Sequence, residues 1–155
     1  FDLLLNALSI LKMENVTIVA LGEKIENADL AANIISTGRI KEESLMAKYY
    51  AAASAFILPS REDNLPNVML ESFSCGTPVI GFPVGGIKEH VINYKTGVLA
   101  KEISSESLAE AISDFTQNAA LFDAKWIRNY AELNFNTALQ ASKYQEVYHE
   151  ILSKS

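Results

Sequence analysis

Short apolar runs alternate with amphipathic stretches along most of the chain. Five compact runs predict strands, at residues 16–21, 33–38, 54–59, 77–82 and 96–100. Apolar residues at helical spacing predict helices at residues 1–13, 42–53, 66–75, 106–117, 119–133 and 136–152, with a short helical piece at 87–92. Pro66 suits the first position of its helix, and Gly76 suits the residue just past its end. The residues PVGG at 83–86 predict a tight turn.

The strand runs are apolar throughout, a pattern that is typical of strands buried on both faces of a parallel sheet. Their alternation with helices predicts an α/β fold, a doubly wound, Rossmann-like parallel sheet flanked by helices. A chain of 155 residues fits one domain, so we expect a single domain over residues 1–155. Ligands of such sheets bind beyond the carboxyl ends of the strands. The loops at those ends are residues 22–23, 38–40, 60–65 and 83–86.

The loop that is richest in polar side chains leads into the helix that begins near Pro66, in the sequence REDNLPNVMLE at residues 61–71. The first amides of a helix lack helical partners and can hold a phosphate. The alternative is that Asn64 or Asp63 only caps the helix.

Glu71 lies in a helix that is otherwise apolar, beside Met69, Leu70 and Phe73. A carboxylate in such a place requires a partner. The partner is either a structural salt bridge or the two hydroxyl donors of a vicinal diol such as a ribose. Glu62 and Asp63 would repel a diphosphate, so sugar hydroxyls suit them better. Phosphate, ribose and sugar are the three parts of a nucleotide-sugar.

The sequence PSREDNLPNVMLESFSCGTPVIGFPVGGIKEHV at residues 59–91 resembles the donor-binding segment of retaining glycosyltransferases with the GT-B fold. The similarity is to the group 1, family 4 enzymes, which include glycogen-synthase-like and sucrose-synthase-like proteins. It rests on an acid and a Glu that are separated by seven residues, here Asp63 and Glu71, on CGTPVIG at 75–81, and on a later Gly-Gly-x-x-Glu. The segments at 38–60 and 94–112 also resemble this family.

The resemblance implies that the chain is the C-terminal, nucleotide-sugar-binding half of a GT-B enzyme. On this reading it is truncated at its N-terminus and lacks the acceptor domain and the first strand. The expected function is transfer of a hexose-type sugar from a nucleotide-diphosphate sugar, such as a UDP- or GDP-sugar, to a glycan, lipid or small-molecule acceptor, with retention. We expect the fragment alone to be inactive. The alternative is a non-catalytic, nucleotide-binding regulatory module of the same fold.

The resemblance also implies roles for individual residues. Glu71 would contact the ribose, and Asp63, or Glu62 beside it, would contact the transferred sugar. The residues expected near the donor's diphosphate and nucleotide are Asn64, Leu65, Asn67, Val68, Arg39 and Ile40, the last two lying near the base. The expected sugar-side loop contains Gly85, Gly86 and Glu89. Enzymes of this fold bind the donor without a metal, so neither a metal nor another cofactor is expected.

Composition argues against several other classes of protein. The net charge of −6 and the lack of a basic run argue against a nucleic-acid partner. The apolar runs are much shorter than the ~18–20 residues of a membrane span. A single cysteine excludes an internal disulfide. We therefore expect a cytoplasmic protein. The family resemblance implies a role in cell-envelope polysaccharide biosynthesis, with peripheral attachment to the inner face of the membrane as an alternative for the full-length protein.

Overall fold

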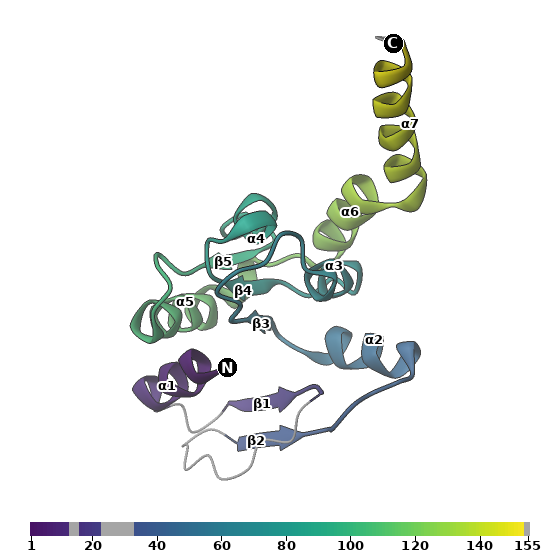
Figure 1. Ribbon diagram of the computed structural model, residues 1–155. Helices are drawn as coiled ribbons and strands as arrows, with labels where there is room; N and C mark the ends of the chain where they lie inside the picture. The colour runs from purple at the N-terminus through teal and green to yellow at the C-terminus, as the bar shows by residue number, and fades with distance from the viewer. Residues whose placement is uncertain (13–15, 23–32, 154–155) are drawn as a thin grey trace.

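The computed structural model describes residues 1–12, 16–22 and 33–153 (Figure 1). The strands are β1 (Thr17–Ala20), β2 (Asn33–Ser36), β3 (Phe56–Leu58), β4 (Val79–Gly81) and β5 (Gly97–Leu99). The helices are α1 (Asp2–Leu11), α2 (Glu43–Ala52), α3 (Asn67–Ser74), α4 (Gly85–His90), α5 (Ser105–Asn118), α6 (Ala124–Phe135) and α7 (Thr137–Ser153), with a 3-10 turn η1 (Ala119–Leu121) before α6. Glu23, which belongs to one of the loops selected from the sequence, lies outside the described residues.

The strands β3, β4 and β5 form a parallel sheet with helices on both faces. Ile80 and Val98 point toward one core, which contains buried residues of α1 and α5. Leu58 and Val79 point toward a second core, which contains buried residues of α3, α4 and α6. Because neighbouring residues of a strand face opposite sides, apolar strands fill both cores at once. The predicted doubly wound α/β fold is confirmed.

The strands β1 and β2 form a separate parallel pair. Along both strands, exposed residues alternate with partly buried ones, and the register neighbours Val19 and Ile35 are 40 % and 47 % exposed. The prediction that all strands are buried on both faces is therefore wrong for this pair. One face packs toward the core through Ile18, whereas no described element buries the other face.

Several helices begin at residues other than the predicted ones, for reasons of local backbone chemistry. Pro66 is the N-cap of α3 rather than its first helical residue. The predicted turn at 83–86 is shorter than expected, because Gly85 and Gly86 already form the start of α4. The single helix predicted at 119–133 is divided at Asp123, whose carboxylate accepts hydrogen bonds from the amides of the first turn of α6 and caps that helix.

The end of α3 follows the sequence prediction closely. Gly76 follows the C-cap residue with a φ of 80°, a conformation that glycine adopts without strain. A Cβ at this position would lie 2.7 Å from the carbonyl oxygen of Ala124, so the glycine also lets the start of α6 approach α3. The two helices consequently pack as one layer over the second core.

The last helix, α7, extends away from the sheet in Figure 1. Large hydrophobic side chains of this helix are exposed: Tyr144, Val147, Tyr148 and Ile151 each expose more than half of their surface. None of the described helices combines the length and the apolar character needed to cross a bilayer.

Candidate functional site

The loops that follow β3 and β4 interlock at the carboxyl edge of the sheet. The amide of Gly86 donates a hydrogen bond to the carbonyl oxygen of Asn64. A Cβ on Gly85 would overlap the carbonyl group of Asp63, and Gly85 has a φ of 41°. Glycine is thus required here both by the backbone conformation and by the close approach of the other loop. The structure brings together two of the sequence-predicted groups, the loop acids and the paired glycines.

The N-terminus of α3 has no side-chain cap. Pro66 is the N-cap residue, and its carbonyl oxygen accepts from the amides of Met69 at 3.0 Å and Leu70 at 3.4 Å. The amides of Asn67 and Val68 have no acceptor among the described residues. The hypothesis that Asn64 or Asp63 merely caps this helix is therefore wrong. Instead, two amide donors and the positive end of the helix dipole face outward beside the loop acids.

Glu71 lies one turn into α3 and is exposed, although its sequence neighbours are apolar. Its Oε2 accepts a hydrogen bond of 3.2 Å from the hydroxyl of Tyr50 on α2. The partner is thus a tyrosine and not the cation of the predicted salt bridge. A carboxylate offers about four lone-pair positions, so Oε1 and part of Oε2 can still accept from a ligand.

Tyr50 is held firmly in place beside Glu71. It is 3 % exposed, and its ring meets Phe56 edge-on with centroids 5.3 Å apart. Its carbonyl oxygen accepts a hydrogen bond of 2.6 Å from the hydroxyl of Thr77. Burial, together with the nearby carboxylate of Glu71, raises the pKa of Tyr50 well above its usual value, so the hydroxyl remains a donor. No sequence motif singled out Tyr50, although it lies within residues 38–60, one of the segments that resemble the family.

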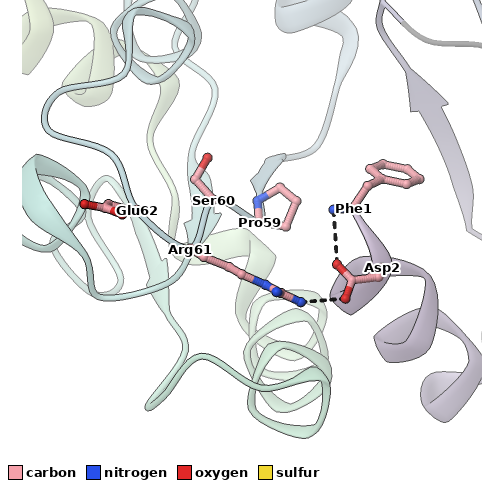
Figure 2. A pocket seen from close by; sticks show the side chains of 6 residues that line it. All are labelled: Phe1, Asp2, Pro59, Ser60, Arg61 and Glu62. Atoms are coloured by element: carbon pink, nitrogen blue, oxygen red, sulfur yellow. Dashed lines mark hydrogen bonds and ion pairs between the residues drawn. The ribbon is translucent and has the colours of Figure 1, made fainter.

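A shallow depression of about 510 Å³ lies where β3 ends and α1 begins (Figure 2). Arg61 reaches across it and pairs with Asp2 at 2.5 Å, with both side chains largely exposed. Glu62 lines the depression and points away from that pair, whereas Asp63 is half-buried next to the Gly85 turn. Glu62 and Asp63, the two candidates for contact with the transferred sugar, therefore lie in different surroundings.

The remaining predicted residues flank this site. Leu65 is exposed, as is Glu89 on α4. Arg39 is exposed and Ile40 half-buried beyond β2, and no hydrogen bond or ion pair joins either residue to the loop at 60–65 within the described parts of the chain. No group of three or more His, Cys, Asp or Glu side chains is placed to hold a metal ion in the described ranges.

His90, at the end of α4, packs between helices. Its Nδ1 lies 3.0 Å from the hydroxyl of Tyr130, and its ring meets Phe135 edge-on. Burial lowers the pKa of His90, with Glu89 opposing and Lys143 reinforcing this effect.

A lowered folded-state pKa predicts that acid destabilises the protein. Below the ordinary histidine pKa the unfolded chain binds the proton first, so the free energy of unfolding should fall as the pH drops from about 7 to about 5. The substitution His90→Gln should flatten this slope, and His149→Gln on exposed α7 should not. Denaturant titrations at several pH values measure both. An unchanged slope in His90→Gln would contradict the assignment.

Comparison with known proteins identifies the family to which these features belong. The family model for glycosyl transferases group 1 matches residues 1–118. The D-inositol 3-phosphate glycosyltransferase of Thermobispora bispora is 34 % identical over an alignment 136 residues long, which covers 82 % of this chain and 31 % of the relative.

Solved structures share the fold. A glycosyltransferase from Rickettsia africae matches with a TM-score of 0.81 at 24 % identity, covering 99 % of this chain and 45 % of the other. The Anabaena protein HepE, solved in complex with UDP-glucose, matches with a TM-score of 0.77 at 20 % identity, covering 96 % and 44 %.

The chain therefore spans less than half of the length of these relatives. The matched residues contain both interlocked loops, the uncapped start of α3 and the Tyr50–Glu71 pair. The resemblance and the GT-B, Rossmann-like fold that it implied are confirmed: this chain belongs to the group 1 glycosyl transferases.

Proposed function

We propose that this chain is the donor-binding half of a retaining glycosyltransferase, which transfers a hexose-type sugar from a nucleotide-diphosphate sugar to an acceptor. The observation that carries the proposal is the uncapped N-terminus of α3, with Glu71 on one side and Asp63 on the other. HepE, which shares the fold, was solved with UDP-glucose, and this supports a nucleotide-sugar ligand.

The diphosphate is assigned to the start of α3. The amides of Asn67 and Val68 point outward from a helix of eight residues, and the amide of Leu65 precedes them in the loop. Such amides bind phosphate oxygens through hydrogen bonds and the helix dipole. During transfer, negative charge develops on the leaving diphosphate, so these donors stabilise the transition state more than the ground state.

The ribose is assigned to Glu71. It lies four residues after Asn67, which places it about 6 Å along the helix axis from the first amides. That distance suits a ribose attached to a diphosphate held at the helix start. Because Tyr50 already donates to Oε2, the ribose hydroxyls would meet a carboxylate whose orientation is set in advance.

The transferred sugar is assigned to the interlocked loops. Asp63, or Glu62 beside it, would accept from sugar hydroxyls, with Gly85, Gly86 and Glu89 forming the opposite wall. Arg39 and Ile40 would lie against the base. Retention of configuration and the absence of a metal or other cofactor from the reaction rest on the family resemblance.

The rest of the reaction belongs to the longer protein. We propose that the acceptor domain precedes residue 1 in the same chain, since the relatives are more than twice as long. We further propose a cytoplasmic enzyme of cell-envelope polysaccharide synthesis, with peripheral attachment to the membrane as the alternative placement.

Titration of the full-length protein with UDP-, GDP- and ADP-sugars, followed by turnover assays, tests the proposal. Saturable binding of one nucleotide-sugar class, with turnover once an acceptor is present, is expected. Binding without turnover for any acceptor would favour the regulatory module. Failure to bind any of the nucleotide-sugars would exclude a donor-binding role.

A truncated protein of residues 1–155 is expected to show no sugar transfer, because the acceptor side of the site lies elsewhere. A radiolabelled-sugar transfer assay that compares it with the full-length enzyme under identical conditions measures this. Transfer by the fragment above background would contradict the assignment of the acceptor domain.

A further inference from the structure

Thr77 lies just past the end of α3, in the segment CGTPVIG at 75–81. It is 3 % exposed, and its hydroxyl donates a hydrogen bond of 2.6 Å to the carbonyl oxygen of Tyr50. Helices α2 and α3 lie side by side, so this bond joins the segment after α3 to the last turn of α2 (Figure 1). Thr77 therefore holds the backbone of the same tyrosine whose hydroxyl contacts Glu71.

The carbonyl group of Tyr50 does not depend on Thr77 for a partner. It also accepts a hydrogen bond of 3.0 Å from the amide of Ala53, the C-cap residue of α2. A carbonyl oxygen has two lone pairs, so both donors can bind at once. Because the second donor comes from a distant part of the chain, it restrains position. The hydroxyl of Thr77 thus fixes where the end of α2 lies relative to α3.

Thr77 is itself held by a buried residue of α3. The Ser72 hydroxyl donates a hydrogen bond of 3.0 Å to the carbonyl oxygen of Thr77, and the amide of Thr77 donates one of 3.0 Å to the carbonyl oxygen of Ser72. Ser72 directly follows Glu71 in the chain. Glu71, Ser72, Thr77 and Tyr50 therefore form a closed ring of hydrogen bonds, of which only Glu71 is exposed.

The hydrogen bond between Tyr50 and Glu71 is sensitive to this restraint. Its oxygen–oxygen distance is 3.2 Å, whereas hydroxyl donors usually lie about 2.5–3.0 Å from an oxygen acceptor. A small shift of the end of α2 away from α3 would therefore break the bond. The ring of Tyr50 has little freedom to compensate, since it packs edge-on against Phe56, whose amide donates a hydrogen bond of 2.8 Å to the carbonyl oxygen of Pro78.

We propose that Thr77 is a positioning residue for donor binding: its hydrogen bond to the backbone of Tyr50 orients the carboxylate of Glu71 toward the ribose hydroxyls. This inference rests on the proposed function, because the ribose assignment of Glu71 is part of that function. Without the Thr77 hydroxyl, the ribose would meet a carboxylate that must be ordered during binding, at a cost in affinity.

The substitutions Thr77→Ala and Thr77→Ser in the full-length protein test this role, since both remove the methyl group and only Ala removes the donor. The ligands are whichever of UDP, GDP and ADP binds the wild type, and its 2′,3′-dideoxy analogue, which has no ribose hydroxyls. Thr77→Ala should weaken binding of the diphosphate roughly three- to tenfold, and Thr77→Ser less than roughly twofold. Binding of the dideoxy analogue should change less than about twofold in both variants. In a Tyr50→Phe background, Thr77→Ala should cause no further loss.

Thr96→Ala is the matched control. The buried Thr96 hydroxyl likewise donates a hydrogen bond of 2.6 Å to the carbonyl oxygen of the last residue of a helix, His90 of α4. This variant should melt at a lower temperature and bind the diphosphate as the wild type does. Ser72→Ala removes a donor to the Thr77 backbone and provides a second, milder variant, which should also weaken binding of the diphosphate more than that of the dideoxy analogue.

Undiminished binding of the diphosphate by Thr77→Ala would overturn the inference. Equal losses for the diphosphate and its dideoxy analogue, or for Thr77→Ala and Thr77→Ser, would also overturn it and make Thr77 merely structural. A wild-type protein that binds none of the three diphosphates would instead contradict the proposed function, and this inference with it.

Discussion

Replacing Glu71 by Gln in the full-length protein is expected to weaken binding of the nucleotide-sugar donor by roughly 10- to 100-fold. Glu71 is exposed on α3, and Tyr50 is its hydrogen-bond partner. The amide of Gln retains one acceptor oxygen but loses the charge and presents a donor to the ribose hydroxyls. The fold should survive, because the side chain is not part of either core. Calorimetric titration with the donor and a thermal melt measure the two effects separately.

The Tyr50 hydroxyl allows a sharper form of this experiment. Tyr50→Phe keeps the ring that packs on Phe56 and removes only the donor to Glu71, so we expect a roughly 3- to 10-fold loss of donor affinity. In a Glu71→Gln background the same change should have little further effect, because the two residues act through one hydrogen bond. Tyr49→Phe, on the same helix, is the matched control.

The outcomes distinguish the role of Glu71 from that of Tyr50. Unchanged donor affinity in Glu71→Gln would make that residue merely structural and would remove the ribose assignment. A large effect of Glu71→Gln, combined with none of Tyr50→Phe, would retain the ribose assignment and show that Tyr50 does not orient the carboxylate.

Replacing Gly85 by Ala is expected to lower the free energy of unfolding by about 2–5 kcal/mol and to abolish measurable donor binding. The new Cβ would overlap the carbonyl of Asp63, and an L-residue is also strained at a φ of 41°. Relief of the overlap must move the loop at 60–65 away from α4. That movement displaces the loop acids and the entry to α3 together. Chemical denaturation and donor titration report the two losses.

Gly38 supplies the matched control for this substitution. It also has a positive φ, 67°, but a Cβ there would meet no atom within 4 Å. Gly38→Ala should therefore cost only the backbone strain, on the order of 1 kcal/mol, and should leave the interlocked loops in place. Equal losses in the two variants would show that the contact between Gly85 and Asp63 contributes nothing.

Much of the fold was predictable because it depends on local pattern. The apolar run that became β4 predicted burial on both faces, and Val79 and Ile80 indeed fill opposite cores. The same prediction was wrong for β1 and β2, because apolar composition does not reveal how much of the chain covers a strand. No described element covers the face that contains Val19 and Ile35, so both residues are exposed.

The candidate site was also predictable from the sequence only in part. The acids around the start of α3 were identified from the sequence, because residue type and spacing carry that information. The sequence did not show that neither Asn64 nor Asp63 caps this helix, because capping depends on side-chain rotamers and loop geometry. The solvent exposure of Glu71 also depends on which side of α3 faces the sheet, a property of the packed molecule.

By itself the sequence determined the α/β class, the order of the elements and the family, since these follow from hydrophobic periodicity, turn residues and motif spacing. Only the tertiary structure decided that Tyr50 meets Glu71 across 21 positions, that the loops after β3 and β4 interlock at Gly85 and Gly86, and that the strands divide into two sheets. The physical reason is that these features arise from contacts between segments distant in the chain. Such contacts depend on how the helices and strands pack in three dimensions.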